Sequence, residues 1–210
     1  MNPRRYDAEA ARDDILDAAE TLFAARGFDA VSTAAIGKVA GVSQSQIHYH
    51  FDTKRKLWEA VFQRRFADYF AAQSALLRND GSTELERLAS SIRAYFSFFQ
   101  ANPDYGKLLG RAALDAVEAG GSLDTADEMG GELMRRGIEI IAAAQAAGTL
   151  RADVRPEFVI VGFLSLVVYW FQAGHVFLAQ AGAGERAPHD SAYLDFLLKI
   201  YLRGVAAEGP

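Results

Sequence analysis

Apolar side chains recur three and four residues apart along most of this 210-residue chain. Between residues 8 and 26 the apolar positions with this spacing are Ile15, Ala18, Ala19, Leu22 and Phe23. Such spacing places the side chains on one face of an α-helix. A strand would show strict alternation between turn residues, and the chain has no such run. The sequence therefore predicts an all-α fold.

Capping and turn residues divide this pattern into separate helices. Gly27 and Gly41 suit the left-handed conformation that follows a helix, and Gly41 begins a tight turn. Ser43-x-x-Gln46 and Thr83-x-x-Glu86 fit the capping box that opens a helix. We expect helices over about 8–26, 33–40, 54–77, 124–147, 156–181 and 190–206, and helices opening at Ser43, Thr83 and Pro103.

The composition argues against catalysis and against a metal or cofactor. The chain has no cysteine, which excludes disulfides, thiolate zinc sites and thiol nucleophiles. It has no glycine-rich phosphate loop, no Gly-x-Ser-x-Gly and no His-Glu-x-x-His. His48, His50 and Asp52 could be interpreted as metal ligands, but residues two apart do not share a helix face. We expect no catalytic residue, no metal and no cofactor.

The stretch 158–171 is the most hydrophobic part of the sequence. It is shorter than the roughly 18–20 residues that cross a bilayer, so it predicts a buried helix. The N-terminus lacks the apolar run of a signal peptide. We therefore expect a cytoplasmic protein with no membrane partner.

Positive charge gathers in one short segment, although the net charge is −5. Residues 1–65 carry 10 Lys/Arg against 9 Asp/Glu, whereas residues 66–210 carry 12 against 18. Residues 38–65 contain six basic and two acidic residues. This distribution is compatible with a solvated helix surface or with a nucleic-acid-binding segment.

Residues 33–51 predict a short helix, a glycine turn and a second short helix. This arrangement lets the first helix brace a second whose N-terminal end enters the major groove of DNA. Gln44, Ser45 and Gln46 would lie at the tip, where amides and hydroxyls can contact base edges. His48, Tyr49, His50 and Lys54 are placed to contact phosphates. Ile36, Val39, Val42 and Ile47 are expected to face inward and fix the angle between the helices.

Within residues 9–65 the chain carries Arg12-x-x-Ile-Leu-x-Ala-Ala-x-x-Leu-Phe23, Gly27, Thr33-x-x-Ile36, Ala40-Gly-Val-Ser43, Ile47-x-x-His-Phe51, Lys54-x-x-Leu57 and Ala60-Val61. With these residues the region resembles the tetracycline-repressor family of bacterial regulators. The resemblance implies an N-terminal three-helix helix-turn-helix DNA-binding domain, 1–65, and a larger helical ligand-binding and dimerisation domain, 66–210. It also implies a repressor that a small molecule releases from its operator.

Carried over position by position, the resemblance implies backbone contacts from Thr33, Tyr49, His50 and Lys54, and base contacts from 44–46. The full set of candidate DNA-binding residues is Thr33, Lys38, Ser43, Gln44, Ser45, Gln46, His48, Tyr49, His50 and Lys54. The chain departs from the family pattern where His48 replaces a frequent tyrosine, where Ala34 and Ala35 replace longer side chains, and where Gly37 replaces alanine. A helical ligand-binding or partner-binding protein without DNA activity is the alternative hypothesis.

The second domain is rich in aromatic residues, and apolar cavities in helical proteins bind small molecules. Candidate effector-binding residues are Phe96, Phe99, Tyr105, Arg111, Phe163, Trp170, Phe171 and His175. The last two helices are apolar on more than one face, so they need both a core and a further surface to pack against. We expect a homodimer formed through these two helices.

Overall fold

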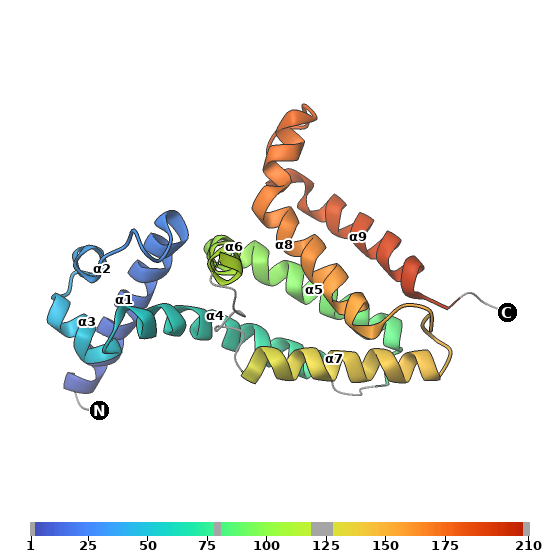
Figure 1. Ribbon diagram of the computed structural model, residues 1–210, viewed down its shortest axis with the longest axis horizontal. Coiled ribbons are helices and arrows are strands. Elements are labelled where there is room, and N and C mark those ends of the chain that lie inside the picture. The colour runs from blue at the N-terminus through green and yellow to red at the C-terminus, as the bar shows by residue number, and fades with distance from the viewer. Residues whose placement is uncertain (1–2, 78–80, 119–127, 208–210) are drawn as a thin grey trace. The chain divides into compact units, whose positions relative to one another are not determined.

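The computed structural model describes residues 3–77, 81–118 and 128–207, and within these ranges it is helical without strands (Figure 1). The elements are α1 (Pro3–Arg26), α2 (Thr33–Ala40), α3 (Gln44–Phe51), α4 (Lys54–Leu76), α5 (Glu84–Ala101), α6 (Pro103–Glu118), α7 (Glu128–Ala146), α8 (Pro156–Gln180), the 3₁₀ turn η1 (Ala187–His189) and α9 (Asp190–Val205). This confirms the all-α prediction. The expected start of a helix at residue 124 lies outside the described residues.

Local signals explain where several helices begin and end. Ser32 caps α2 by accepting a hydrogen bond from the Ala35 amide, and Thr83 forms the expected capping box with Glu86 at the start of α5. Gly27 ends α1 and Gly41 ends α2, with φ values of 79° and 71°. Both glycines therefore adopt the left-handed backbone that other residues avoid.

The helices form two compact units, each with its own contacts. The first contains Met1–Ala67 with Asp104–Thr125, and the second contains Asp68–Pro103 with Ala126–Pro210. α4 runs without interruption from the first unit into the second. α6 groups with the first unit, although the predicted division at residue 65 counts it in the second.

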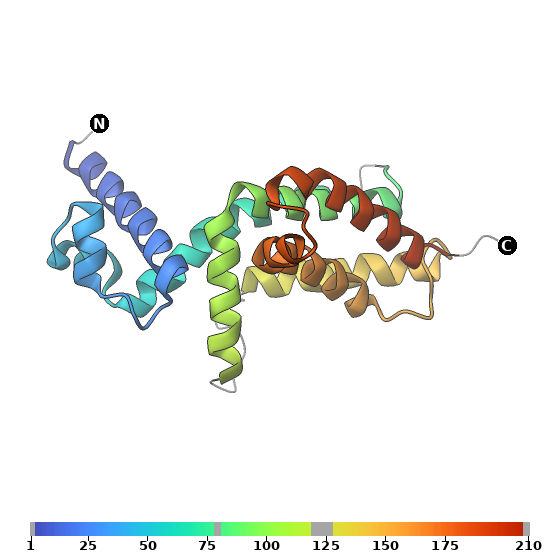
Figure 2. The same ribbon diagram turned by 90° about the horizontal axis from the view of Figure 1, so that it is seen from above.

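In the first unit, α1 supplies more buried apolar residues than any other helix. Ile15, Leu16, Ala19 and Phe23 of this helix are fully buried. Figure 2 shows α2 and α3 lying together beside α1, and α1 contacts both of them. Glu20 is also buried on α1, where it pairs with two arginines of α4.

In the second unit, α8 contacts α5, α7 and α9 (Figure 1). Two glycines allow the helices to approach closely. A Cβ at Gly137 of α7 would lie 2.7 Å from Cδ1 of Ile160, and one at Gly162 of α8 would lie 2.9 Å from the Tyr201 hydroxyl. The absence of a side chain therefore lets α7 and α9 pack directly against α8.

Candidate nucleic-acid interface

The turn between α2 and α3 is closed by the backbone itself. The Val42 amide donates to the Gly37 carbonyl at 3.0 Å. Gly37 is buried, and a Cβ there would lie 2.8 Å from the carbonyl oxygen of Val42. The departure from alanine at this position is therefore a steric requirement of the turn. The low helix propensity of glycine accompanies a closer approach of the two helices.

Buried side chains fix which face of α3 points outward. Ile47 and Phe51 are 1% and 5% exposed, and Ile36 of α2 is fully buried. Because Ile47 and Phe51 lie four residues apart, they share one face of α3. The exposed residues of this helix are Gln44, Ser45, Gln46, His48 and Tyr49. Tyr49 is 83% exposed, so its ring is available to another molecule.

The prediction that Val39 faces inward is wrong, because its side chain is 59% exposed. α2 buries Ile36 and Gly37. With about 100° per residue, the direction midway between these two lies roughly 110° from Val39 and close to Ala40. Val39 points toward solvent because the buried face of α2 includes Gly37. Glycine has no apolar side chain, so the sequence pattern did not place it on the buried face.

Hydrogen bonds hold the side chains at the tip of α3. Ser43 and Gln46 form the predicted capping box, in which the Gln46 Oε1 accepts from the Ser43 amide at 2.9 Å and also from its hydroxyl. Gln44 reaches across to α2, and its Nε2 donates to Oγ1 of Thr33 at 2.9 Å. The two glutamines therefore present different free atoms to solvent.

Lys54 folds back onto the protein. Its ammonium group donates to the carbonyl oxygens of Phe28 and Val31, both at 3.0 Å, and lies 4.2 Å from the centre of the Phe28 ring. It thereby holds the loop between α1 and α2, and one of its three N–H bonds remains for another acceptor. The sequence gives no local sign of this role, because the partners lie more than 20 residues away.

Most basic side chains of residues 38–65 have acidic partners. Lys56 lies 2.8 Å from Asp52, Arg55 lies 3.2 Å from Glu59, and Arg64 and Arg65 both contact Glu20. The hydrogen bond and charge of Lys56 lower the pKa of Asp52, and the same contact raises the pKa of Lys56. Lys38 is exposed and has no ion pair among the described residues.

His48, His50 and Asp52 do not converge on one point. The Nδ1 of His48 faces the backbone oxygen of Asp52 at 2.9 Å, and the Asp52 carboxylate faces Lys56. The His50 ring lies against Tyr49 and Phe51, with ring centres 5.2 and 6.2 Å apart. Among the described residues no group of three histidine, aspartate or glutamate side chains is arranged to hold a metal ion.

The candidate effector-binding residues fall into separate places. Five lie in the second unit on α5 and α8: Phe96, Phe99, Phe163, Trp170 and Phe171. The Phe171 ring contacts Phe96 and Phe99, with centres 4.9 and 5.8 Å apart. His175 is exposed on α8.

Tyr105 and Arg111 lie on α6, in the first unit. The Tyr105 ring meets the edge of Phe62 at 5.7 Å. Arg111 donates from Nε to the carbonyl of Ala24 and from Nη2 to that of Ala25, both at 3.1 Å. A cation at the end of α1 also interacts favourably with the helix dipole.

Sequence reasoning missed the polar groups beside the aromatic cluster. Asp190 is 3% exposed, and its carboxylate accepts from Trp170 Nε1 at 2.8 Å and from Arg186. Gln100 of α5 lies 3.5 Å from the same carboxylate. The only sequence signal was the acidic residue at the start of a helix, which is equally common at exposed positions.

Family models match both parts of the chain. Residues 15–61 match bacterial regulatory proteins of the tetR family, and residues 85–207 match the tetracyclin repressor-like C-terminal domain. The second match alone spans more than half of the chain.

Individual proteins agree with these matches. The chain is 26% identical over 205 residues to the HTH-type transcriptional repressor NicS of Pseudomonas putida, covering 96% of this chain and 95% of that protein. It is 31% identical over 85 residues to the HTH-type transcriptional repressor KstR2 of Mycolicibacterium smegmatis, covering 40% and 41%. The fold matches the solved ketosteroid transcriptional regulator KstR2 of Mycobacterium tuberculosis, with a TM-score of 0.73, 17% identity, and 99% and 97% coverage.

These matches favour the DNA-binding hypothesis over a partner-binding protein without DNA activity. The helix, glycine turn and second helix of residues 33–51 lie inside the first family match. The helices from α5 onward lie in the second. This chain therefore belongs to the tetracycline-repressor family and is a DNA-binding transcriptional regulator.

Proposed function

We propose that the chain is a cytoplasmic homodimeric repressor that leaves its operator when a small apolar effector binds. Regulators of this family bind operators and effectors and are typically dimers. The observation that carries the proposal is the outward face of α3, whose exposed side chains are polar or aromatic and stand on a buried apolar anchor. The chain acts by binding, and no catalytic step is needed for this role.

The DNA contacts divide into two groups. Gln44, Ser45 and Gln46 contact base edges, since the N-terminal end of a recognition helix enters the major groove. The remaining candidates contact the phosphate backbone: Thr33, Lys38, Ser43, His48, Tyr49, His50 and Lys54. The unpaired ammonium of Lys38 and the exposed ring of Tyr49 support this assignment. Phosphate contacts fix the register of the helix on the duplex, while base contacts select the sequence.

A second copy covers the exposed apolar surface of α8 and α9. The apolar stretch 158–171 belongs to α8, which by length and composition could span a membrane, and only 28% of its most apolar window is buried. The expectation of a stretch too short for a span that forms a buried helix is therefore wrong for the single chain. The large exposed side chains on the two helices are Phe158, Val161, Leu166, Tyr169, Val176, Phe177, Phe196 and Ile200. Since a water-soluble regulator rarely leaves such an area uncovered, pairing of α8 and α9 across a two-fold axis accounts for it.

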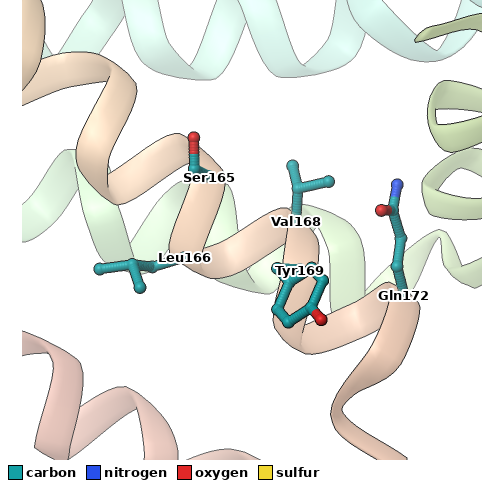
Figure 3. A pocket seen from close by; sticks show the side chains of 5 residues that line it. All are labelled: Ser165, Leu166, Val168, Tyr169 and Gln172. Atoms are coloured by element: carbon teal, nitrogen blue, oxygen red, sulfur yellow. The ribbon is translucent and has the colours of Figure 1, made fainter. Parts of the chain in front are cut away.

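The α8 surface is also hollowed. An open hollow of about 410 Å³ is lined by Ser165, Leu166, Val168, Tyr169 and Gln172. Figure 3 shows Ser165, Val168 and Gln172 pointing to one side of the helix. A hollow with an apolar lining suits side chains inserted from a partner helix.

The aromatic cluster of α5 and α8 is the proposed effector site. Trp170 donates to the Asp190 carboxylate, and Gln100 lies 3.5 Å from the same carboxylate. Aromatic rings with a few polar groups beside them are the composition expected of a small-molecule site. An effector releases DNA only if it binds better to the dimer whose recognition helices are wrongly spaced. α4 is the proposed lever, because it follows α3 after two residues and continues into the second unit.

Light scattering and gel-shift measurements test the dimer and its link to DNA binding. The wild-type chain should be a dimer that shifts its own upstream DNA. Phe196→Glu, which places a charge on the proposed interface, should yield monomers and lower operator affinity at least ten-fold. Leu114→Glu is the matched control, because Leu114 is 66% exposed but lies on α6. A monomeric wild type, or a Phe196→Glu dimer with full affinity, contradicts the proposal.

A further inference from the structure

We propose that Thr33 is a positioning residue that orients the Gln44 amide to recognise adenine. This inference rests on the proposed base contact of Gln44. The two side chains come from different helices, and Nε2 of Gln44 donates to Oγ1 of Thr33 at 2.9 Å. Gln44 is otherwise exposed at the first position of α3, where its side chain would rotate freely. The hydrogen bond removes that freedom before DNA arrives.

The atoms that remain free on Gln44 define what it can read. A glutamine amide has two N–H donors and one oxygen acceptor. Thr33 occupies one donor, so one N–H and the oxygen remain. Recognition of adenine uses the N–H that lies beside the oxygen, with Thr33 taking the other one. The major-groove edge of adenine presents one acceptor, N7, and one donor, the N6 amino group, whereas guanine presents two acceptors. The fixed amide therefore matches adenine and mismatches guanine.

Gln46 provides an internal contrast. Its Oε1 already accepts from the amide and the hydroxyl of Ser43 within the capping box. It offers donors to the groove, which suit the acceptors of guanine or thymine. The two glutamines of α3 thus carry different preferences because each has a different partner, Thr33 or Ser43.

Thr33 also connects base reading to the backbone. Its hydroxyl accepts from Gln44 and retains its own hydrogen, which remains available to a phosphate oxygen. The neighbouring Ala34 and Ala35 have no polar side-chain atoms. The first turn of α2 therefore affects base selection through the hydrogen bond from Gln44 to Thr33.

Selection of binding sites from a pool of random duplexes tests the inference with the full chain. Wild-type sites should carry adenine at one position of each half-site. Gln44→Ala should lose that preference by about ten-fold, the order expected for one bidentate pair. Thr33→Val, which cannot accept the hydrogen bond, should weaken the same preference several-fold and leave the base preferences at other positions unchanged. Because it also loses the proposed phosphate contact of Thr33, it should lower the affinity for all sites alike. Thr33→Ser keeps the hydroxyl and should retain the preference.

The outcomes separate positioning from a general loss of structure. Ser32, not Thr33, caps α2 with its side chain, so Thr33→Val should keep the wild-type melting temperature. The inference is overturned if Thr33→Val lowers the affinity for every sequence by the same factor and leaves the preference for adenine intact. It is also overturned if Gln44→Ala changes the base preference only at positions where the wild type does not select adenine. A wild-type chain that enriches no sequence overturns the proposed base contacts themselves, and this inference with them.

Discussion

The carboxylate of Glu20 on α1 lies 2.9 Å from Nη2 of Arg64 on α4. The Glu20 carboxylate also accepts a hydrogen bond from Nε of Arg65 at 2.9 Å, and the Glu20 side chain is only 7% exposed. A buried carboxylate is tolerated only when charged donors surround it. This contact joins the first helix of the DNA-binding unit to the helix that leads out of it.

We expect Glu20→Gln to lower the free energy of unfolding by about 2 kcal/mol, because it leaves two arginines without their buried partner. The value is below that of a fully buried pair, since the arginines are 23% and 33% exposed. Urea unfolding measures the change.

Asp17→Asn is the matched control, because Asp17 also contacts Arg64, at 2.7 Å, but is 66% exposed. It should cost less than about 0.5 kcal/mol, as exposed pairs do. Equal effects of the two substitutions would show that burial of Glu20 is unimportant.

Gly37→Ala should disrupt the turn between α2 and α3. The added Cβ would lie 2.8 Å from a backbone oxygen, which cannot move without shifting α3. We expect a loss of about 1–3 kcal/mol in the free energy of unfolding, typical of overpacking, together with weaker operator binding. Thermal melting and a gel shift check both effects.

Gly131→Ala is the comparison for Gly37→Ala. Gly131 also lies in a helix, but nothing surrounds the position of its Cβ within 4 Å. Alanine should therefore stabilise α7 by up to about 1 kcal/mol through helix propensity. Similar destabilisation by both substitutions would rule out the steric explanation at Gly37.

The local features of this fold could be predicted from sequence because they depend on neighbouring residues. The Ser43–Gln46 capping box and the left-handed Gly41 need only the residues next to them. The partners of Lys54 and Arg111 could not be predicted in this way. Each side chain donates to carbonyl oxygens more than 20 residues away, and the sequence shows only a basic residue on a helix.

The candidate site shows the same division. The tip of α3 and its exposure follow from the helix pattern and the apolar anchor Ile47. The hydrogen bond between Thr33 and Gln44 does not, because it depends on the angle between α2 and α3. That angle is set by the close approach at Gly37, a residue whose sequence signal is only a low helix propensity.

Asp190→Ala should destabilise the second unit by about 2–4 kcal/mol, since it leaves a buried indole N–H and a guanidinium without their acceptor. The Asp190 carboxylate holds Trp170 at 2.8 Å, and the Tyr193 ring stacks on Trp170 with centres 3.9 Å apart. Asp195 lies on the same helix and is exposed, so Asp195→Ala should change the free energy of unfolding by no more than about 0.5 kcal/mol. Urea unfolding followed by tryptophan fluorescence distinguishes them, and comparable losses would contradict a special role for Asp190.

Tyr201 should make stability fall at high pH. Its hydroxyl donates to the carbonyl of Val159, and burial raises the pKa of Tyr201 from 10.0 to about 12. The folded state thus keeps this proton after the unfolded chain has lost it. The stabilising contribution is complete below pH 10.0 and is lost as pH rises toward about 12.

Tyr201→Phe should remove this part of the pH dependence, so the loss of unfolding free energy between about pH 9 and pH 11.5 should be smaller in the variant than in wild type. Ultraviolet absorbance should show the same difference as a missing component that titrates near pH 12. The phenol is held against Gly162, so its ionisation would place a charge where α8 and α9 meet. If the titration and the stability profile of Tyr201→Phe match those of wild type, Tyr201 is not shielded from water in the way this packing requires.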